Sequence, residues 1–242
     1  MSQPPVPDFV PHQLGELGIE LAPSQTEQCA VFLDRLLEAN QRMNLTGIRE
    51  HSQAWQRHII DSLSILFLLD QLEAGDRLID VGSGGGLPGI PLAIARPELE
   101  VTLLEATGKK LNFLRQTAEA MGLANIRFIH ARAEDAGRQP AHRQHYDTAV
   151  CRALGPMREL LEYTLPLVRL GGMLVAMKGP SVAEEMAQAG DALHLLGGGR
   201  VDVVDTYPES MPWRTVAVVV IKEHPTPPEY PRQPGLPRQS PL

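Results

Sequence analysis

The stretch LIDVGSGGGLPGIP, residues 78–91, organises this chain. Its apolar start predicts a buried strand, and the glycines that follow supply the backbone angles and close approach that a ligand-cradling turn needs. The turn opens into a predicted helix with Pro88 and Pro91 in its first turns, where a missing N–H costs little. Free N–H groups at a helix start favour polar or anionic ligand groups. The stretch therefore predicts a nucleotide-like cofactor site at the carboxyl end of a first parallel strand.

The glycines alone leave the cofactor open. Gly84, Gly86 and Gly89 satisfy the G-x-G-x-x-G dinucleotide fingerprint, but this match is weak in a chain with 21 glycines. Asp80, at the strand end, would repel a pyrophosphate and would suit the ammonium and sulfonium groups of S-adenosylmethionine. Pro88 removes an N–H donor where a pyrophosphate would need one. These residues favour S-adenosylmethionine as cofactor, with NAD as the alternative.

Composition limits the class of protein. The 242 residues, 43% of them hydrophobic, are enough for one sizeable core, and a net charge of −7 means that any nucleic-acid binding needs a local basic patch. The only cysteines, Cys29 and Cys151, lie in apolar contexts, which fits reduced thiols in a cytosol. No signal sequence opens the chain, and the most apolar run, residues 63–69, is too short to span a bilayer. We therefore expect a soluble, cytoplasmic protein.

Four segments follow from the pattern along the chain. They are an N-terminal tail (1–24), an N-terminal helical layer (25–72), a core (73–223) and a Pro-rich C-terminal tail (224–242) that we expect to be extended and mobile. Residues 24–27 (SQTE) resemble a capping box, which predicts a helix that starts at Gln25. A second helix is predicted over residues 52–72.

Strands and helices alternate from residue 78 onward. The predicted strands cover residues 78–81, 101–104, 126–130, 148–151, 173–177, 201–206 and 215–221, and the predicted helices 109–121, 157–168 and 182–196. The last two strands have only a short Pro/Trp-containing loop between them, which predicts a hairpin. We expect an α/β protein with a Rossmann-like, seven-stranded, mostly parallel sheet and a terminal β-hairpin, the layout of class I S-adenosylmethionine-dependent methyltransferases.

Candidate site residues follow from the rule that ligands bind at the carboxyl ends of parallel strands. These ends carry Asp80, Gly82, Glu105, Ala133, Glu134, Arg152 and Lys178. The position of Glu105 suits a carboxylate that accepts both ribose hydroxyls, although an acid that complements a helix dipole is the alternative. Glu134 would lie beside the adenine or be a solvated charge. Arg152 and Lys178 would face the same cleft, unless a salt bridge to Asp80 or Glu105 explains one of them.

Other chemistry finds little support. His58 and Asp61 share a helix face, and a satisfied buried hydrogen bond is a simpler interpretation than a catalytic dyad. The eight histidines are scattered and no Cys-x-x-Cys occurs, so we expect no metal. There is no Gly-x-Ser-x-Gly elbow and no Walker lysine.

Seven motifs in register resemble a narrower group, the GidB family of bacterial methyltransferases that act on guanine N7 in small-subunit 16S ribosomal RNA. They are Asn44-Leu45-Thr46, Arg57-His58-x-x-Asp61-Ser62, the glycine-rich stretch over 80–90, Lys109-Lys110-x-x-Phe113-Leu114, Ala131-Arg132-Ala133-Glu134, Arg152-Ala153 and Lys178-Gly179. The resemblance covers roughly residues 28–223. The tail over 230–237 also resembles the C-termini of some members.

The resemblance implies a set of S-adenosylmethionine-binding residues and two positions at the target base. The binding residues are Gly82, Leu87, Glu105, Ala106, Thr107, Ala133, Glu134 and Arg152, to which the glycine-rich stretch adds Asp80 and Gly84. Arg152 and Lys178, as the catalytic pair, would face the guanine or its phosphate. Guanine N7 has a free lone pair, so its methylation needs no general base.

The remaining expectations concern the partner. Arg132, Lys109, Lys110 and Arg115 would form a basic rim for phosphates. The acidic net charge predicts weak binding to naked RNA, with specificity supplied by a folded ribosomal particle, and we expect a monomer. The alternatives are a methyltransferase for small molecules, a nicotinamide oxidoreductase and a non-catalytic RNA-binding module.

Overall fold

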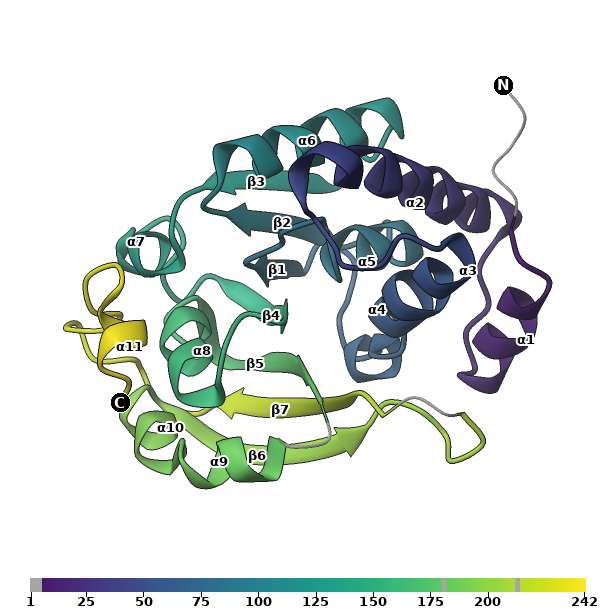
Figure 1. Ribbon diagram of the computed structural model, residues 1–242. Coiled ribbons are helices and arrows are strands. Elements are labelled where there is room, and N and C mark those ends of the chain that lie inside the picture. The colour runs from purple at the N-terminus through teal and green to yellow at the C-terminus, as the bar shows by residue number, and fades with distance from the viewer. Residues whose placement is uncertain (1–5, 180–181, 212–213) are drawn as a thin grey trace.

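The computed structural model describes residues 6–179, 182–211 and 214–242, and these form one seven-stranded sheet in the order β3-β2-β1-β4-β5-β7-β6 (Figure 1). The strands are β1 (Arg77–Val81), β2 (Glu100–Glu105), β3 (Ile126–His130), β4 (Tyr146–Arg152), β5 (Val168–Lys178), β6 (Gly198–Asp205) and β7 (Val216–Lys222). Strands β1 to β5 are mutually parallel, and β7 pairs antiparallel with β5 and β6. The predicted Rossmann-like sheet with its terminal hairpin is confirmed. The expected Pro/Trp positions of the hairpin loop, 212 and 213, lie outside the described residues.

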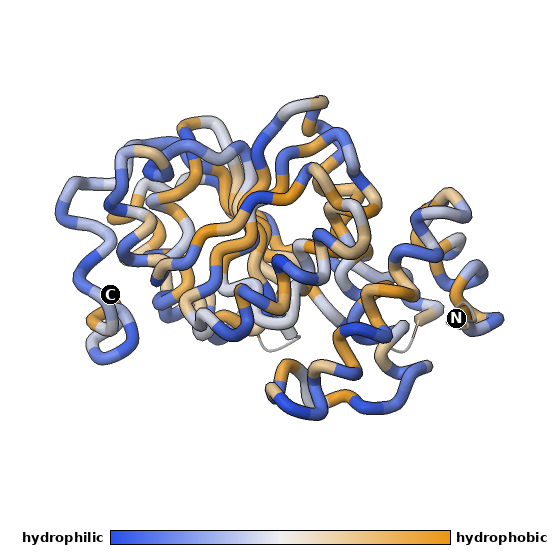
Figure 2. Tube along the Cα trace, turned by 90° about the horizontal axis from the view of Figure 1, so that it is seen from above, coloured by the Kyte–Doolittle hydropathy of each residue, from blue (hydrophilic) through white to orange (hydrophobic). Residues whose placement is uncertain are grey.

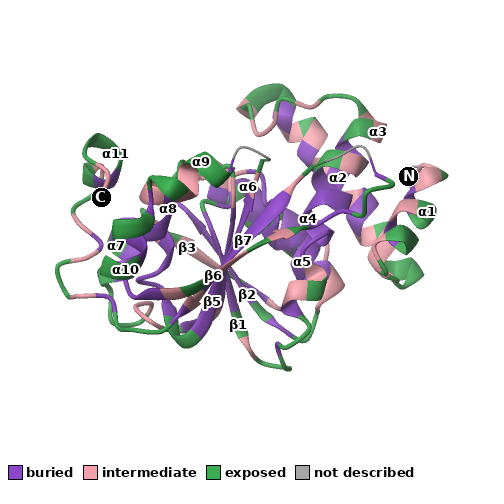
Figure 3. Cartoon of the chain, turned by 90° about the horizontal axis from the view of Figure 1, so that it is seen from below, coloured by how far each residue is buried: buried purple, intermediate pink, exposed green. Residues whose placement is uncertain are grey.

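Helices cover both faces of the sheet. One layer contains α1 (Phe9–Glu16), α2 (Pro23–Met43), α3 (His51–Ala54), the π-helical η1 (Trp55–Ile60), α4 (Asp61–Leu63), the 3-10 helix η2 (Leu66–Leu69), α5 (Gly89–Ala95) and α6 (Gly108–Ala120). The other contains α7 (Ala133–Arg138), α8 (Met157–Thr164), α9 (Val182–Ala187) and α10 (Gly190–Leu195), with α11 (Leu236–Gln239) beside α8. Because side chains alternate along a strand, Leu78 packs into the first layer and Ile79 into the second. Apolar and buried residues gather on the strands between the layers (Figures 2 and 3).

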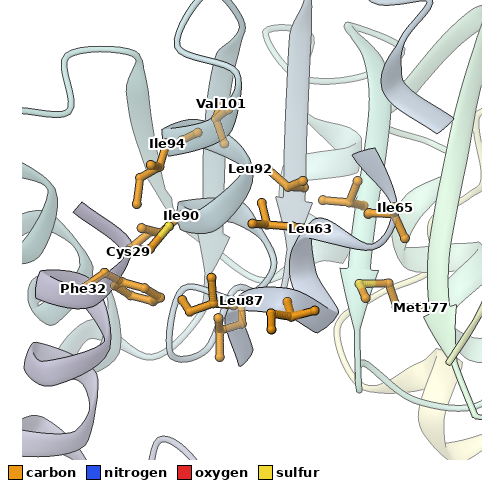
Figure 4. Close-up of a cluster of buried hydrophobic side chains, with 14 of the residues drawn as sticks. Cys29, Phe32, Leu63, Ile65, Leu87, Ile90, Leu92, Ile94, Val101 and Met177 are labelled. Atoms are coloured by element: carbon orange, nitrogen blue, oxygen red, sulfur yellow. The ribbon is translucent and has the colours of Figure 1, made fainter. Parts of the chain in front are cut away.

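The N-terminal helices share their core with the sheet. Phe32 of α2, Leu63 of α4 and Ile90 of α5 belong to one buried cluster with Val101 of β2 and Met177 of β5 (Figure 4). Burying each such side chain contributes about 1.5–3 kcal/mol. This shared core runs across the predicted boundary at residue 72. The division of the chain into four segments stays a prediction.

The N-terminal segment is not simply a tail. Helix α1 lies within it and buries Val10 and Leu14, which are four residues apart and so share one helix face. The predicted start of the next helix was also wrong, because α2 begins at Pro23. The side chain of Gln25 accepts a hydrogen bond from the Ala22 N–H, and proline suits a first helical position.

The C-terminal segment is docked, which corrects the expected extended and mobile tail. Arg143 donates to the carbonyl oxygens of Thr226, Pro227 and Tyr230. Arg232 forms an ion pair with Glu162 of α8, whose side chain is fully buried. Prolines lack N–H groups, but their carbonyl oxygens remain acceptors, and here partly buried arginines supply the donors.

A single predicted helix over 52–72 is in fact several short turns. Glu50 caps the first turn by accepting from the N–H groups of Ser52 and Gln53. The π-helical turn Trp55–Ile60 then changes the direction in which side chains point. Such turns are rare and frequently occur at functional sites. In this chain η1 places His58 and its neighbours at the sheet's carboxyl edge. Over the described residues, no helix combines the length and apolar character that a membrane crossing requires.

Candidate active site

Two cavities adjoin at the carboxyl ends of the strands. The β2–β3 cavity, about 570 Å³, is lined by Gly82, Leu104, Glu105, Ala106, residues 131–134, Leu154, Gly155, Pro156, Glu159, Tyr163 and Arg238. The β4–β5 cavity, about 650 Å³, is lined by Leu45, Thr46, Ile48, Arg57, His58, Asp61, residues 82–85, Leu87, Lys110, Arg152, Ala153, residues 177–179, Glu185, Arg214 and Thr215. Gly82 lines both. A further cavity, about 710 Å³ and mainly apolar, lies between α1 and the start of α2, away from the strand ends.

Gly82 and Gly89 occupy positions where a side chain would not fit. Gly82 has a φ of 75°, and a Cβ there would lie 2.6 Å from Leu154 Cδ1. Gly89 starts α5, and its N–H donates to Asp80 Oδ2 at 3.0 Å. The glycine turn is therefore held from beneath by a buried carboxyl group.

Asp80 lies below the cavities and not in them. Its side chain has no exposed area, and burial raises the pKa of Asp80 to about 7. The expectation that Asp80 faces the ammonium and sulfonium of the cofactor is wrong for this geometry. Asp80 instead complements the start of α5, so the N–H that a pyrophosphate would need is already used. From the sequence, NAD was disfavoured by the charge of Asp80 and the missing N–H of Pro88. In the structure, it is disfavoured because the Gly89 N–H is bonded to Asp80.

Gly89→Ala is expected to destabilise the fold by about 1–3 kcal/mol, the usual cost of overpacking. The new Cβ would collide with Leu103 Cδ2 and lie 2.7 Å from Asp80 Oδ2. Urea denaturation measures the loss. Gly190→Ala is the matched control, because Gly190 also starts a helix and a Cβ there meets no heavy atom within 4 Å. Equal midpoints for the two variants would contradict the prediction.

Glu105 connects the end of β2 to the glycine turn. Its Oε2 accepts from the Gly84 N–H at 2.9 Å and its Oε1 from the Thr107 N–H at 2.7 Å. Each carboxylate oxygen can accept a second hydrogen bond, so two acceptor positions remain for a pair of ribose hydroxyls. The backbone bonds fix the carboxylate before any ligand binds. Glu105 therefore fits the predicted ribose-binding role.

Glu134 lies across the same cavity and is held by the C-terminal segment. Its Oε1 accepts from the Gly235 N–H at 2.9 Å, and Arg238 of α11 lines the cavity beside it. The Glu134 side chain is only 4% exposed, which excludes the alternative of a solvated charge.

Arg152 projects from the end of β4 into the β4–β5 cavity. Its Nη1 donates to Asp61 Oδ2 at 3.0 Å and to the Arg57 carbonyl at 2.9 Å. Asp61 Oδ1 accepts from the hydroxyls of Tyr207 and Thr215, at 3.1 and 2.6 Å. A network that spans η1, α4 and the terminal hairpin thus fixes the guanidinium.

Lys178 ends β5 and is paired in the same way. Its Nζ lies 2.5 Å from Glu185 Oε2 and donates to the Gly155 carbonyl at 2.8 Å. The Met157 N–H donates to the same Glu185 oxygen at 3.0 Å. The predicted alternatives, ion pairs of these cations with Asp80 or Glu105, do not occur; Asp61 and Glu185 are the partners.

His58 and Asp61 both line the β4–β5 cavity without bonding each other. His58 Nε2 lies 2.8 Å from Thr46 Oγ1, and Nδ1 lies 3.0 Å from the Arg57 carbonyl. Burial and the nearby Arg152 charge lower the pKa of His58 to about 4, so it is neutral at pH 7. The predicted hydrogen bond within this pair is therefore wrong: each residue is satisfied by other partners, and this arrangement does not form a His–Asp dyad.

Residues 25–209 match the family model GidB, described as rRNA small subunit methyltransferase G. The chain belongs to this family. The ribosomal RNA small subunit methyltransferase G of Moorella thermoacetica is 42% identical over 236 residues, which cover 94% of both chains. That of Chloroflexus aggregans is 44% identical over 227 residues, which cover 93% of both.

Solved structures support the fold. A predicted O-methyltransferase from Agrobacterium tumefaciens superimposes with a TM-score of 0.54 at 21% identity, over 66% of this chain and 80% of its own. A candidate S-adenosyl-L-methionine-dependent methyltransferase from Methanococcus maripaludis gives 0.53 at 12% identity, over 71% and 90%. These structures confirm the fold, and membership of the GidB family confirms the predicted methyltransferase class, with S-adenosylmethionine as the cofactor. The family excludes the alternative of a nicotinamide oxidoreductase.

The structure brings most of the predicted site residues to the two cavities. Gly82, Glu105, Ala106, Ala133 and Glu134 line the β2–β3 cavity, and Gly84, Leu87, Arg152 and Lys178 line the β4–β5 cavity. Thr107 lines neither and contributes its N–H to Glu105. Of the predicted basic rim, Lys110 and Arg132 line the cavities, whereas Lys109 does not and Arg115 lies over the Phe128 ring.

Several cavity residues were missed by sequence reasoning about strand ends. They are Thr46, Arg57, Glu185, Arg214, Tyr163 and Arg238. Thr46 and Arg57 lie in motifs of the GidB resemblance, which could have identified them. The other four come from helices and loops distant in sequence. Over the described residues, no cluster of three or more His, Cys, Asp or Glu side chains could hold a metal ion.

Proposed function

We propose that this protein transfers a methyl group from S-adenosylmethionine to N7 of one guanine in the 16S rRNA of the small ribosomal subunit. One observation of the structure carries the proposal beyond family membership. The β2–β3 cavity, which suits an adenosine, meets at Gly82 a β4–β5 cavity whose lining includes five cationic side chains. A chain of net charge −7 concentrates positive charge where an RNA backbone would need it.

The residues divide into two roles. Glu105 would hold the ribose and Glu134 the adenine, with Gly82, Gly84, Leu87, Ala106 and Ala133 as the cavity wall. S-adenosylmethionine, when bound, supplies a methyl group on a sulfonium. Arg152 and Lys178 would orient the target nucleotide beside it. No side chain needs to remove a proton from N7, because its lone pair is free. Alignment of the reactants can contribute about 7–11 kcal/mol in favourable cases.

Incubation with labelled S-adenosylmethionine and small subunits from a strain that lacks the enzyme tests the proposal. We expect label in 7-methylguanosine at one position of the 16S rRNA. Deproteinised RNA is the comparison, and we expect it to be a poorer substrate because the protein is acidic overall. Cofactor binding without labelled RNA would overturn the RNA substrate and favour a small-molecule methyltransferase.

Arg152→Ala and Lys178→Ala are each expected to lower kcat/KM for small subunits on the order of 100-fold, as misplacement of a reactant does. The Kd of S-adenosylmethionine should change much less, because Glu105 and the glycine turn stay in place. Methylation kinetics and calorimetry measure the two effects. Arg169→Ala is the control, since Arg169 pairs with Asp147 at the opposite edge of the sheet. Unchanged kinetics in both cavity variants would contradict these roles.

We also propose that the protein acts as a monomer in the cytoplasm. In the described part of the chain, the exposed large hydrophobic side chains belong to five different elements and give no single apolar face. Both cysteines are buried free thiols, which suits a reducing compartment. Light scattering of the purified protein tests the monomer, and fractionation of the native host tests the compartment.

A further inference from the structure

The two strand-end cations are each neutralised by a carboxylate. Arg152 pairs with Asp61, and Lys178 pairs with Glu185. These two acids also line the β4–β5 cavity, next to the place where the target base would lie. Carboxylates would weaken a site that only had to hold RNA phosphates. We therefore expect Asp61 or Glu185 to interact with a chemical group other than an RNA phosphate.

The proposed reaction supplies such a group, and the inference rests on that function. N7 attacks the methyl carbon, the carbon–sulfur bond breaks with its electron pair going to sulfur, and no proton is transferred. The positive charge therefore passes from the sulfonium to the purine ring. Unpaired cations beside the base would oppose this step, whereas a carboxylate at the ring edge would favour it.

Among the described residues, the two carboxylates differ in how many of their oxygens accept a hydrogen bond. Both oxygens of Asp61 accept hydrogen bonds, from Tyr207 and Thr215 and from Arg152. Glu185 uses Oε2 alone, for Lys178 and the Met157 N–H. Within the described residues, no hydrogen bond reaches Glu185 Oε1. Its side chain is 30% exposed, which leaves it accessible to a ligand.

We propose that Glu185 reads the target guanine by accepting hydrogen bonds through Oε1 from the guanine N1–H and N2 amino groups. Lys178 and the Met157 N–H hold the other oxygen and so orient the carboxylate. Adenine presents an acceptor at N1 and has no N2 amino group, so it would be rejected. The same carboxylate stabilises the positive charge that develops on the ring. Glu185 thus couples the choice of base to the rate of methyl transfer.

A substrate with inosine at the target position tests this pairing, because inosine retains N7, O6 and N1–H but lacks the N2 amino group. Small subunits are reconstituted with guanosine or inosine at the mapped site, and the rates at which the wild type and Glu185→Ala methylate each of them are measured. The wild type should prefer guanine by about 10- to 150-fold, the range for a hydrogen bond to a charged group. The variant should show a preference below about threefold. Glu185→Gln, which keeps an acceptor but not the charge, should lie between them.

Glu184→Ala is the matched control, since Glu184 is the exposed neighbour on α9 and lines neither cavity. It should keep the wild-type preference for guanine. A second measurement needs no methyl transfer and can be used if Glu185→Ala is too slow to assay. It compares the binding of the guanosine-containing and the inosine-containing small subunits in the presence of S-adenosylhomocysteine. An equal guanine preference in wild type and Glu185→Ala, in rates or in binding, would overturn the inference. Failure of the wild type to methylate small subunits would instead overturn the proposed function.

Discussion

Glu105→Gln is expected to raise the Kd of S-adenosylmethionine by about 100-fold or more. The carboxylate accepts one backbone N–H on each oxygen, from Gly84 and Thr107. A glutamine offers only one acceptor oxygen, and its amino group would face one of these N–H donors. The two bonds to ribose hydroxyls would also lose their charge, at about 1.5–3 kcal/mol for each bond to a charged group.

Titration calorimetry with S-adenosylmethionine and S-adenosylhomocysteine measures this loss. Glu100→Gln is the matched control, because Glu100 is an exposed carboxylate at the other end of β2. The control should bind like the wild type. A Kd for Glu105→Gln within threefold of the wild type would mean that the ribose lies elsewhere.

Arg232→Ala is expected to lower the free energy of unfolding by about 3–5 kcal/mol, the cost of leaving a buried charge without its partner. The Arg232 side chain makes three hydrogen bonds to Glu162, whose carboxylate is fully buried. The Arg232 backbone N–H also donates to Glu162 and would remain. Release of the C-terminal segment would free Glu134 from Gly235 as well, so cofactor binding should weaken in the same variant.

Urea denaturation measures the stability, and two further variants isolate the cause. Arg200→Ala removes an ion pair with Asp202 on an exposed part of β6 and should cost no more than about 1 kcal/mol. The double variant Arg232→Ala, Glu162→Leu removes the unpaired charge and should recover much of the loss. A single variant as stable as the wild type would show that the segment docks without this ion pair.

The sheet could be predicted from the sequence because its signals are local. Apolar runs such as residues 216–221 mark the strands, and the alternation of strands with helices predicts a parallel order. The strand ends then identified Glu105, Arg152 and Lys178 before any contact was known. Their partners could not be identified in this way, because Arg152 meets Asp61 across 91 residues of sequence.

Both terminal segments differ from the predicted tails, because α1 forms in the first and the second is docked. Prolines predicted a loose chain at the C-terminal end. At the N-terminal end, Pro11 lies in the first turn of α1, where proline is tolerated. The C-terminal segment is held by arginines such as Arg143, which lies more than 80 residues earlier. Docking of this kind depends on donors elsewhere in the fold, which no local pattern reveals.

The bond between Gly235 and Glu134 spans 101 residues, and this has a consequence for biosynthesis. A chain emerging from the ribosome can complete strands β1 to β5 while the residues that orient Glu134 are still being translated. The adenine side of the pocket is therefore finished last. A partly synthesised enzyme would have its sheet and its glycine turn but only weak affinity for the methyl donor.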